Sequence, residues 1–291
     1  MGDIVGAGLV SHAPVIMFPQ EMRLEANGGK DFTLATGLTR LGAELDTLSH
    51  DTVVVVDTHW ATTTETVLTS HARRTGVFTS DEMPGAIHSL PYDLPGDPEL
   101  AKAFDTLAAK RSVWASANDN EHLPVHYGLL NIHRYLGRPG VPWLSLSVCQ
   151  TAEPEDYLAV GALLAEAARE TGRRVVVLAS GGLSHRFWPL RELRARMAGD
   201  PAHIISAAAR EADLARIAWL ERGEHRKVIE TMPEYAAFEP EARFGHYLTL
   251  AGAIGGTAAT TPARRFSEYE NGIGTGHVHL WFDRPARGWP A

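Results

Sequence analysis

Short apolar runs along this chain alternate with longer stretches in which apolar residues recur every three or four positions. The short runs predict buried strands, and they lie at residues 4–10, 53–56, 143–149 and 173–179. The longer stretches have the spacing of amphipathic helices, and they lie at residues 32–48 and 157–171. Strands that alternate with helices are typical of parallel sheets. We therefore expect an α/β fold with a central, mostly parallel or mixed β-sheet flanked by helices.

Polar residues, and histidines above all, follow three of these strands. His12 comes shortly after the first strand, and Asp57 and His59 follow the run VVVV at 53–56. His185 follows a later strand across the small-residue turn SGGLS. Right-handed crossovers bring the carboxyl ends of parallel strands to one edge of a sheet, where ligands bind in open α/β folds. We expect these histidines at that edge, either as metal ligands or as partly buried side chains that only bond a neighbour.

The rest of the pattern is less regular. Residues 62–78 predict further strand, whereas residues 83–98 are rich in Pro and Gly and predict an irregular lid or substrate loop. Residues 201–222 predict one helix. Near the end of the chain, His277 and His279 alternate with apolar residues, so we expect both on one face of a strand.

Composition narrows the class of protein. The chain has 291 residues without a repeat or a linker, so we expect a single domain over residues 1–291. A formal net charge of -8 gives no support for nucleic-acid binding. The single cysteine, Cys149, excludes an internal disulfide and fits a reducing compartment, and no apolar run approaches transmembrane length. We expect a cytoplasmic protein with a small-molecule partner and neither a membrane nor a nucleic-acid partner.

An acidic loop supplies carboxylates that complement the histidines. Glu234, Glu239 and Glu241 lie within ten residues of one another. Two histidines and one carboxylate leave about three of six metal positions open, which suits Fe(II) that binds a chelating substrate and O2 together. The same ligands also suit a catalytic zinc hydrolase.

Six short motifs carry a resemblance to a known family. In order along nearly the whole chain, they are SHAP at 11–14, DTHW at 57–60, GVFTSDEMP at 76–84, LASGGLSHRF at 178–187, MPEYA at 232–236 and GTG at 274–276. With these motifs the chain resembles the class III extradiol ring-cleaving dioxygenases of the LigB-like superfamily, and within them the branch that cleaves homoprotocatechuate (3,4-dihydroxyphenylacetate). The resemblance implies the fold of that family in a single catalytic domain. It also implies cleavage of a catechol ring with O2 to a muconic semialdehyde.

The resemblance further implies a set of iron ligands. The Fe(II) ligands of the family fall on His12, His59 and a glutamate that precedes the small-residue helix GHYLTLAGAIGG. We place this glutamate at Glu241, with Glu239 as the competitor and Glu234 as the third choice.

The acid–base residues follow from the same resemblance. The catalytic base falls on His185. Where many relatives have a second histidine, this chain has Tyr127, whose phenol is expected to donate a hydrogen bond because free tyrosine has a pKa of about 10. His126 and His122 lie in the same polar loop and are the alternative proton donors.

The substrate site is expected to include Pro14, His122, Arg186 and Arg243. The two arginines either anchor a substrate carboxylate or form surface ion pairs. The expected partners are a small aromatic substrate, O2 and further copies of the chain in a homo-oligomer. A 2-aminophenol-type ring-cleaving dioxygenase of the same family is the nearest rival function, and a non-enzymatic protein on the same fold is another.

Overall fold

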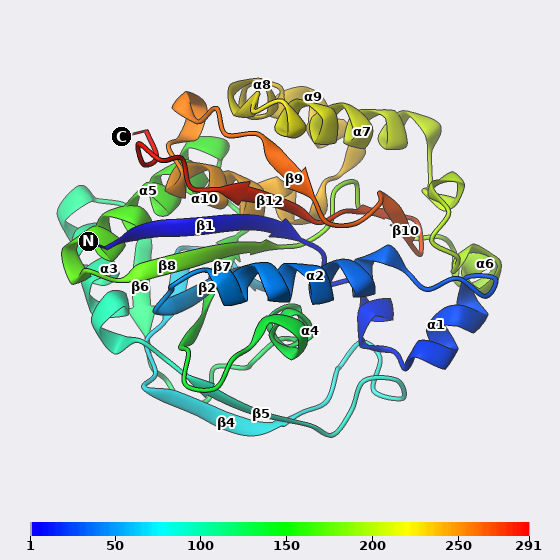
Figure 1. Cartoon of the computed structure of the whole chain (residues 1–291), viewed down its shortest axis with the longest axis horizontal. Coiled ribbons are helices and arrows are strands. Elements are labelled where there is room, and N and C mark those ends of the chain that lie inside the picture. The colour runs from blue at the N-terminus through cyan, green and yellow to red at the C-terminus, as the bar shows by residue number, and fades with distance from the viewer. Residues whose placement is uncertain (1, 291) are drawn as a thin grey trace.

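An eight-stranded sheet runs through the centre of the protein, and the computed structural model describes residues 2–290 around it (Figure 1). The strand order is β6-β3-β7-β2-β8-β1-β12-β9. These strands are β1 (Asp3–Val10), β2 (Thr52–Thr62), β3 (Thr66–Thr69), β6 (Ala115–Asn118), β7 (Trp143–Cys149), β8 (Arg174–Ser180), β9 (Ala263–Arg265) and β12 (Leu280–Asp283). Two smaller sheets pair β4 (Arg73–Phe78) with β5 (Leu90–Pro95) and β10 (Glu270–Gly272) with β11 (Thr275–His277).

The middle of the large sheet is parallel. The neighbours β7, β2, β8 and β1 all pair in parallel, whereas β12 and β9 run antiparallel at one side and β3 is antiparallel to β7. Parallel neighbours need crossover connections, which place helices on the faces of the sheet. The expected α/β fold with a mostly parallel, mixed sheet is confirmed.

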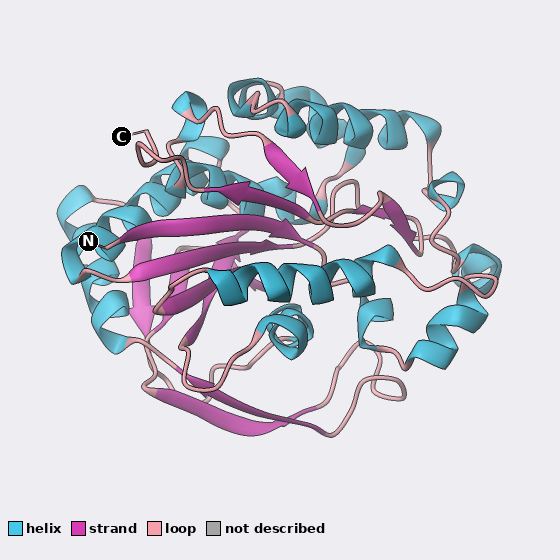
Figure 2. Ribbon diagram, viewed as in Figure 1, coloured by secondary structure: helices cyan, strands magenta, loops and turns pink. Residues whose placement is uncertain are grey.

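Helices cover both faces of this sheet (Figure 2). They are α1 (Gln20–Ala26), α2 (Thr33–Thr47), α3 (Pro98–Arg111), α4 (Tyr127–Leu136), α5 (Pro154–Thr171), α6 (Leu190–Leu193), α7 (Ala207–Glu221), α8 (His225–Glu230), α9 (Met232–Tyr235) and α10 (Gly245–Ala253). Val53 and Val55 belong to the apolar cluster of α2 and α4, whereas Val54 and Val56 belong to the cluster of α3, α5 and α10. Successive strand residues point to opposite faces, so this run of valines is buried by two helical layers.

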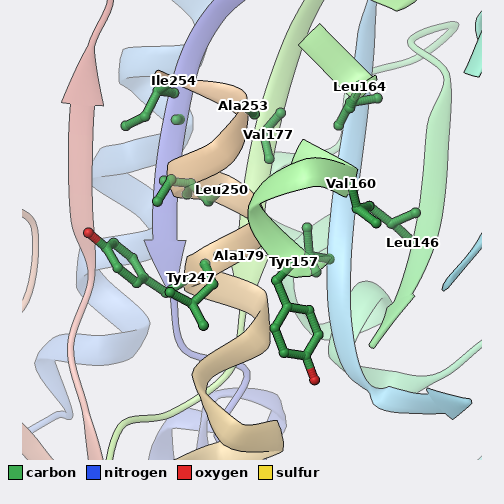
Figure 3. Packing of buried hydrophobic residues seen from close by; sticks show 14 of the residues in the cluster. Leu146, Tyr157, Val160, Leu164, Val177, Ala179, Tyr247, Leu250, Ala253 and Ile254 are labelled. Carbon is green, nitrogen blue, oxygen red and sulfur yellow. The ribbon is translucent and has the colours of Figure 1, made fainter. Parts of the chain in front are cut away.

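The second of these clusters is the larger, and Figure 3 shows part of it. Tyr157 and Val160 of α5 and Leu250 of α10 pack there together with Val177 and Ala179 of β8. This packing fixes the position of β8, at whose carboxyl end the SGGLS turn begins.

Three expectations from the sequence are corrected. Residues 83–98 are not wholly irregular, because β5 pairs with β4; as half of an isolated two-stranded ribbon, β5 has an unpaired side that tolerates its prolines. The helix expected from residue 201 begins at Ala207, since the Ser206 hydroxyl caps it by accepting from the Ala209 N–H. The strand expected through His277 and His279 is interrupted: His277 ends β11, and His279 precedes β12.

None of the helices in residues 2–290 combines the length and the apolar character that crossing a membrane requires.

Candidate metal centre

β1 and β8 end side by side at one edge of the sheet (Figure 1), and β2 passes this level at Asp57 and continues, after an irregularity, to Thr62. Val10 of β1 and Asp57 of β2 both pair with Ser180 of β8, so the residues that follow them lie side by side. The ring centroids of His12 and His59 are 4.7 Å apart. The structure thus brings the two histidines together at the edge that the strand pattern predicted.

The neighbours of His12 determine which of its ring nitrogens carries the proton. Nδ1 of this buried side chain lies 2.8 Å from Ser180 Oγ, and that hydroxyl donates to the Gly128 carbonyl at 3.0 Å. Because the hydroxyl proton goes to the carbonyl, Ser180 accepts a hydrogen bond from His12 Nδ1–H. The lone pair of His12 Nε2 then faces Glu241 Oε1 at 3.3 Å. Pro14, which is half-buried, begins a 3-10 turn directly after this segment.

The carboxylate of Glu241 is buried and faces the histidines. Its Oε1 accepts from the Thr58 hydroxyl, and its Oε2 accepts from the Gly182 N–H at 2.5 Å. Burial alone would raise the pKa of Glu241, but its interactions with the neighbouring imidazoles of His12 and His185 hold that pKa well below its usual range. The carboxylate is therefore an anion aimed into the same space as the two imidazoles.

An unusual backbone carries Glu241. Residues 242–244 have φ between 45° and 62°, and Glu239 has a φ of 49°, although none of them is glycine. Two hydrogen bonds hold this segment to the SGGLS turn: the Glu241 N–H donates to the Leu183 carbonyl at 2.9 Å, and the His185 N–H donates to the Glu239 carbonyl at 3.0 Å. Left-handed conformations of such residues persist where the surroundings enforce them, which is common at functional sites.

These residues fit a divalent metal ion. His12, His59 and Glu241 each offer one ligand atom, and the three atoms lie within 4.8 Å of one another. The lone pair of His12 Nε2 faces an anionic carboxylate. A cation between them would accept the lone pair and balance the negative charge. Two imidazoles and one carboxylate form the ligand set of mononuclear centres with open positions for substrate.

His185 lies beside this group and outside it. Its Nε2 is 3.5 Å from Glu241 Oε2, and 26% of its side chain is exposed. Its ring packs edge-on against Phe187 at 4.8 Å between centroids. The imidazole is thus close enough to exchange a proton with a molecule held at the metal position.

Tyr127 packs against both histidines of the group. Its ring centroid is 4.0 Å from that of His59, and burial raises the pKa of Tyr127 well above its usual range, so the phenol keeps its proton. Burial lowers the pKa of His126, which lies at the start of α4. His122 is mostly exposed, 3.8 Å from the Glu121 carboxylate.

Other predicted residues lie at the surface. Glu239 is exposed and pairs with Arg186 at 2.6 Å, and Arg243 pairs at 2.9 Å with the glutamate that precedes α5. Of the two roles expected for these arginines, the structure shows the surface ion pairs. Glu234 is exposed on α9, and neither it nor Glu239 belongs to the metal group found among residues 2–290.

Sequence reasoning missed Glu82, although the motif GVFTSDEMP contains it. Its Oε1 lies 3.2 Å from His59 Nδ1, and its Oε2 accepts from the Tyr127 hydroxyl at 3.5 Å. Burial would lower the pKa of His59, but Glu82 and Glu241 raise it. A carboxylate on the outer nitrogen of a ligating histidine orients the ring. The loop that carries Glu82 has no regular pattern, so nothing local indicated where this side chain points.

Comparisons with known proteins identify the family of this chain. The family described as the catalytic LigB subunit of aromatic ring-opening dioxygenase matches residues 6–278. The 3,4-dihydroxyphenylacetate 2,3-dioxygenase of Escherichia coli is 28% identical over 244 residues, which cover 82% of this chain and 85% of that protein. The 2-aminophenol 1,6-dioxygenase alpha subunit of a Pseudomonas sp is 25% identical over 259 residues, covering 87% of this chain and 90% of that protein.

A solved structure shares the fold. The crystal structure of an uncharacterized protein from Escherichia coli K12 matches with a TM-score of 0.64 and 19% identity, over 96% of this chain and 99% of that one. The family match spans nearly the whole chain and includes all the residues of the metal group. The chain therefore belongs to the LigB family of catalytic subunits of aromatic ring-opening dioxygenases, and it is a ring-cleaving dioxygenase.

Proposed function

We propose that this protein is a non-haem Fe(II)-dependent extradiol dioxygenase, which cleaves a 3,4-dihydroxyphenylacetate-like catechol with O2 to a muconic semialdehyde. The observation that carries the proposal is the convergence of His12, His59 and Glu241, with His185 adjacent to the group. Fe(II) held by His12, His59 and Glu241 would supply open positions for the substrate oxygens and O2, and the electron that O2 activation requires.

The roles of the protein side chains follow from their positions. His185 accepts a proton from a ring hydroxyl, because an imidazole takes up and returns protons near neutral pH. Tyr127 donates a hydrogen bond to an oxygen of the bound substrate or of O2, and its buried phenol is better placed for this than the exposed His122. His126 remains the alternative donor.

The substrate is supported less directly than the reaction class. Similarity to the dihydroxyphenylacetate enzyme favours a catechol, whereas similarity to the aminophenol enzyme makes 2-aminophenol the second candidate. Arg186 and Arg243 bind a substrate carboxylate only if it displaces their glutamate partners. A single catalytic domain over residues 1–291, a cytoplasmic location and a homo-oligomer are parts of the same proposal.

Oxygen uptake by protein loaded with Fe(II) under anaerobic conditions tests this function. We expect uptake with 3,4-dihydroxyphenylacetate or a related catechol, a product absorbance typical of ring fission, and loss of activity after oxidation in air. Mn(II) is a candidate substitute for Fe(II). Faster turnover of 2-aminophenols than of every catechol would move the substrate to the rival class, and full turnover with Zn(II) alone would contradict the redox-metal proposal.

A further inference from the structure

A buried carboxylate on α7 has no part in the site described so far. Asp213 is fully buried, and its oxygens accept from the hydroxyl and the N–H of Ser184, at 2.7 and 3.2 Å, and from the hydroxyls of Tyr235 at 2.7 Å and Tyr269 at 2.5 Å. Burial raises the pKa of Asp213, but hydrogen bonds from these donors oppose that effect. Four donors around one carboxylate occupy most of its lone pairs, which gives it a single orientation.

The chain is shaped to admit this carboxylate. A Cβ atom on Gly276 would lie 2.2 Å from Asp213 Oδ2 and 2.6 Å from the Tyr269 hydroxyl oxygen, so no larger residue fits there. Tyr235 belongs to the motif MPEYA, Gly276 to GTG and Ser184 to LASGGLSHRF. Three motifs that are far apart in the sequence therefore meet at one side chain that none of them contains.

This cluster holds the segment that carries His185. On one side, the Leu183 N–H donates to the Gly276 carbonyl at 2.8 Å, and the Gly276 N–H donates to the Ser184 carbonyl at 3.0 Å. On the other side, the same segment bonds the backbone around Glu241. Hydrogen bonds therefore hold the backbone of residues 183–185 from both sides. Asp213 adds hydrogen bonds from the N–H and hydroxyl of Ser184, the residue directly before His185.

We propose that Asp213 is a positioning residue for the ring-cleavage reaction: through Ser184, and with Tyr235 and Tyr269 as its supports, it aims the imidazole of His185 at the reacting hydroxyl. The inference rests on the proposed role of His185 as the base. The hydrogen bonds of Asp213 reach none of the residues of the metal group, so it acts on His185 through Ser184.

A double-mutant cycle with Asp213→Asn and His185→Ala tests the inference on the iron-loaded enzyme. Alone, Asp213→Asn is expected to lower kcat about ten- to a hundredfold, the usual range for an outer residue that orients a site, with iron content and KM unchanged. In the His185→Ala background it is expected to cause no further loss, because its effect passes through the missing imidazole.

The cycle separates two failures. If His185→Ala impairs turnover and Asp213→Asn lowers kcat by the same factor in both backgrounds, or leaves it unchanged, the positioning role is wrong and the base assignment stands. Normal turnover of His185→Ala removes the base assignment and the positioning role together.

Milder variants keep the test decisive if Asp213→Asn does not fold. Tyr235→Phe and Tyr269→Phe each remove one donor to Asp213 and are expected to lower kcat less than Asp213→Asn does. Tyr247→Phe is the matched control, since Tyr247 is also buried but its hydroxyl lies 3.0 Å from His225 Nδ1 and not at Asp213. It is expected to lose stability without losing kcat. If both test variants fold and keep the kcat of the control, the inference is overturned.

Discussion

The two halves of the metal centre are built on different kinds of backbone. His12 follows β1 and His59 lies in the last part of β2, both in the middle of the sheet, and residues 53–56 before His59 are fully buried. Glu241 and His185 lie on irregular segments outside the sheet, where the φ angles of residues 242–244 are positive and backbone hydrogen bonds join the two segments.

This difference shows how the side chains in each half are held in position. A strand end is placed by apolar burial over many residues, which is local in sequence and strong in sum. The loop half is placed by a few hydrogen bonds between residues more than fifty positions apart, against a left-handed backbone that costs about 1–2 kcal/mol per residue. The strand half is therefore the more robust, and the loop half the more easily displaced.

The largest effect is expected from removing a ligand in either half. His12→Ala, His59→Ala and Glu241→Ala should each lose bound iron and turnover together, because the remaining two ligands do not hold Fe(II) against water. Iron content after gel filtration and oxygen uptake measure this. Glu239→Ala is the matched control and should keep both; loss of iron from it, with retention in Glu241→Ala, would reverse the choice of carboxylate.

A smaller effect is expected at the base. His185→Ala should retain iron and bind catechol, yet lower turnover by roughly two to four orders of magnitude, the range for a lost general acid–base group. Iron analysis, substrate titration and steady-state kinetics check the three properties separately. Loss of iron from this variant would instead place His185 among the ligands.

The buried histidines behind the site predict how stability depends on pH. Burial lowers the pKa of His279 to about 4 and that of His277 to about 3, from 6.5. These side chains stay neutral in the folded protein while the unfolded chain takes up protons below pH 6.5. The free energy of unfolding should therefore fall as the pH drops from about 6.5 toward 4, by up to about 1.4 kcal/mol per pH unit for each histidine.

Urea unfolding of metal-free protein at several pH values measures this slope. His279→Gln should reduce it, because one site of proton uptake is lost. The control His122→Gln should leave it unchanged, since this side chain is mostly exposed. A flat profile between pH 6.5 and 4.5 would show that the buried histidines are protonated in the folded state.

The smallest effect concerns the backbone of the loop half. Glu239→Gly should raise the free energy of unfolding by no more than about 1 kcal/mol, because glycine adopts the φ of 49° at this position without strain. The thermal midpoint should rise slightly with it. Loss of its exposed pair with Arg186 matters little. Glu234→Gly, an equally exposed change in the helical α9, should lower the midpoint instead. Equal shifts in the two variants would show that residue 239 carries no backbone strain.

The sequence by itself determined the fold class and the strand half of the site. Apolar periodicity reports which residues are buried, so the apolar strand residues before His12 and His59 and the helix α2 between them were predictable, whereas the short α1 was not. The order of six motifs also indicated the family to which the chain belongs.

In the loop half, the family resemblance pointed to His185 and favoured Glu241, and only the tertiary structure separated Glu241 from its acidic neighbours. Glu234, Glu239 and Glu241 lie in one acidic segment, and no local pattern distinguishes them, because the side of a loop that faces inward depends on what it pairs with. Here the pairing partner is Leu183, and it turns Glu241 inward and leaves Glu239 in solvent. For the same reason the sequence did not indicate a role for Asp213, because its hydrogen-bond donors come from chain segments that only the fold brings together.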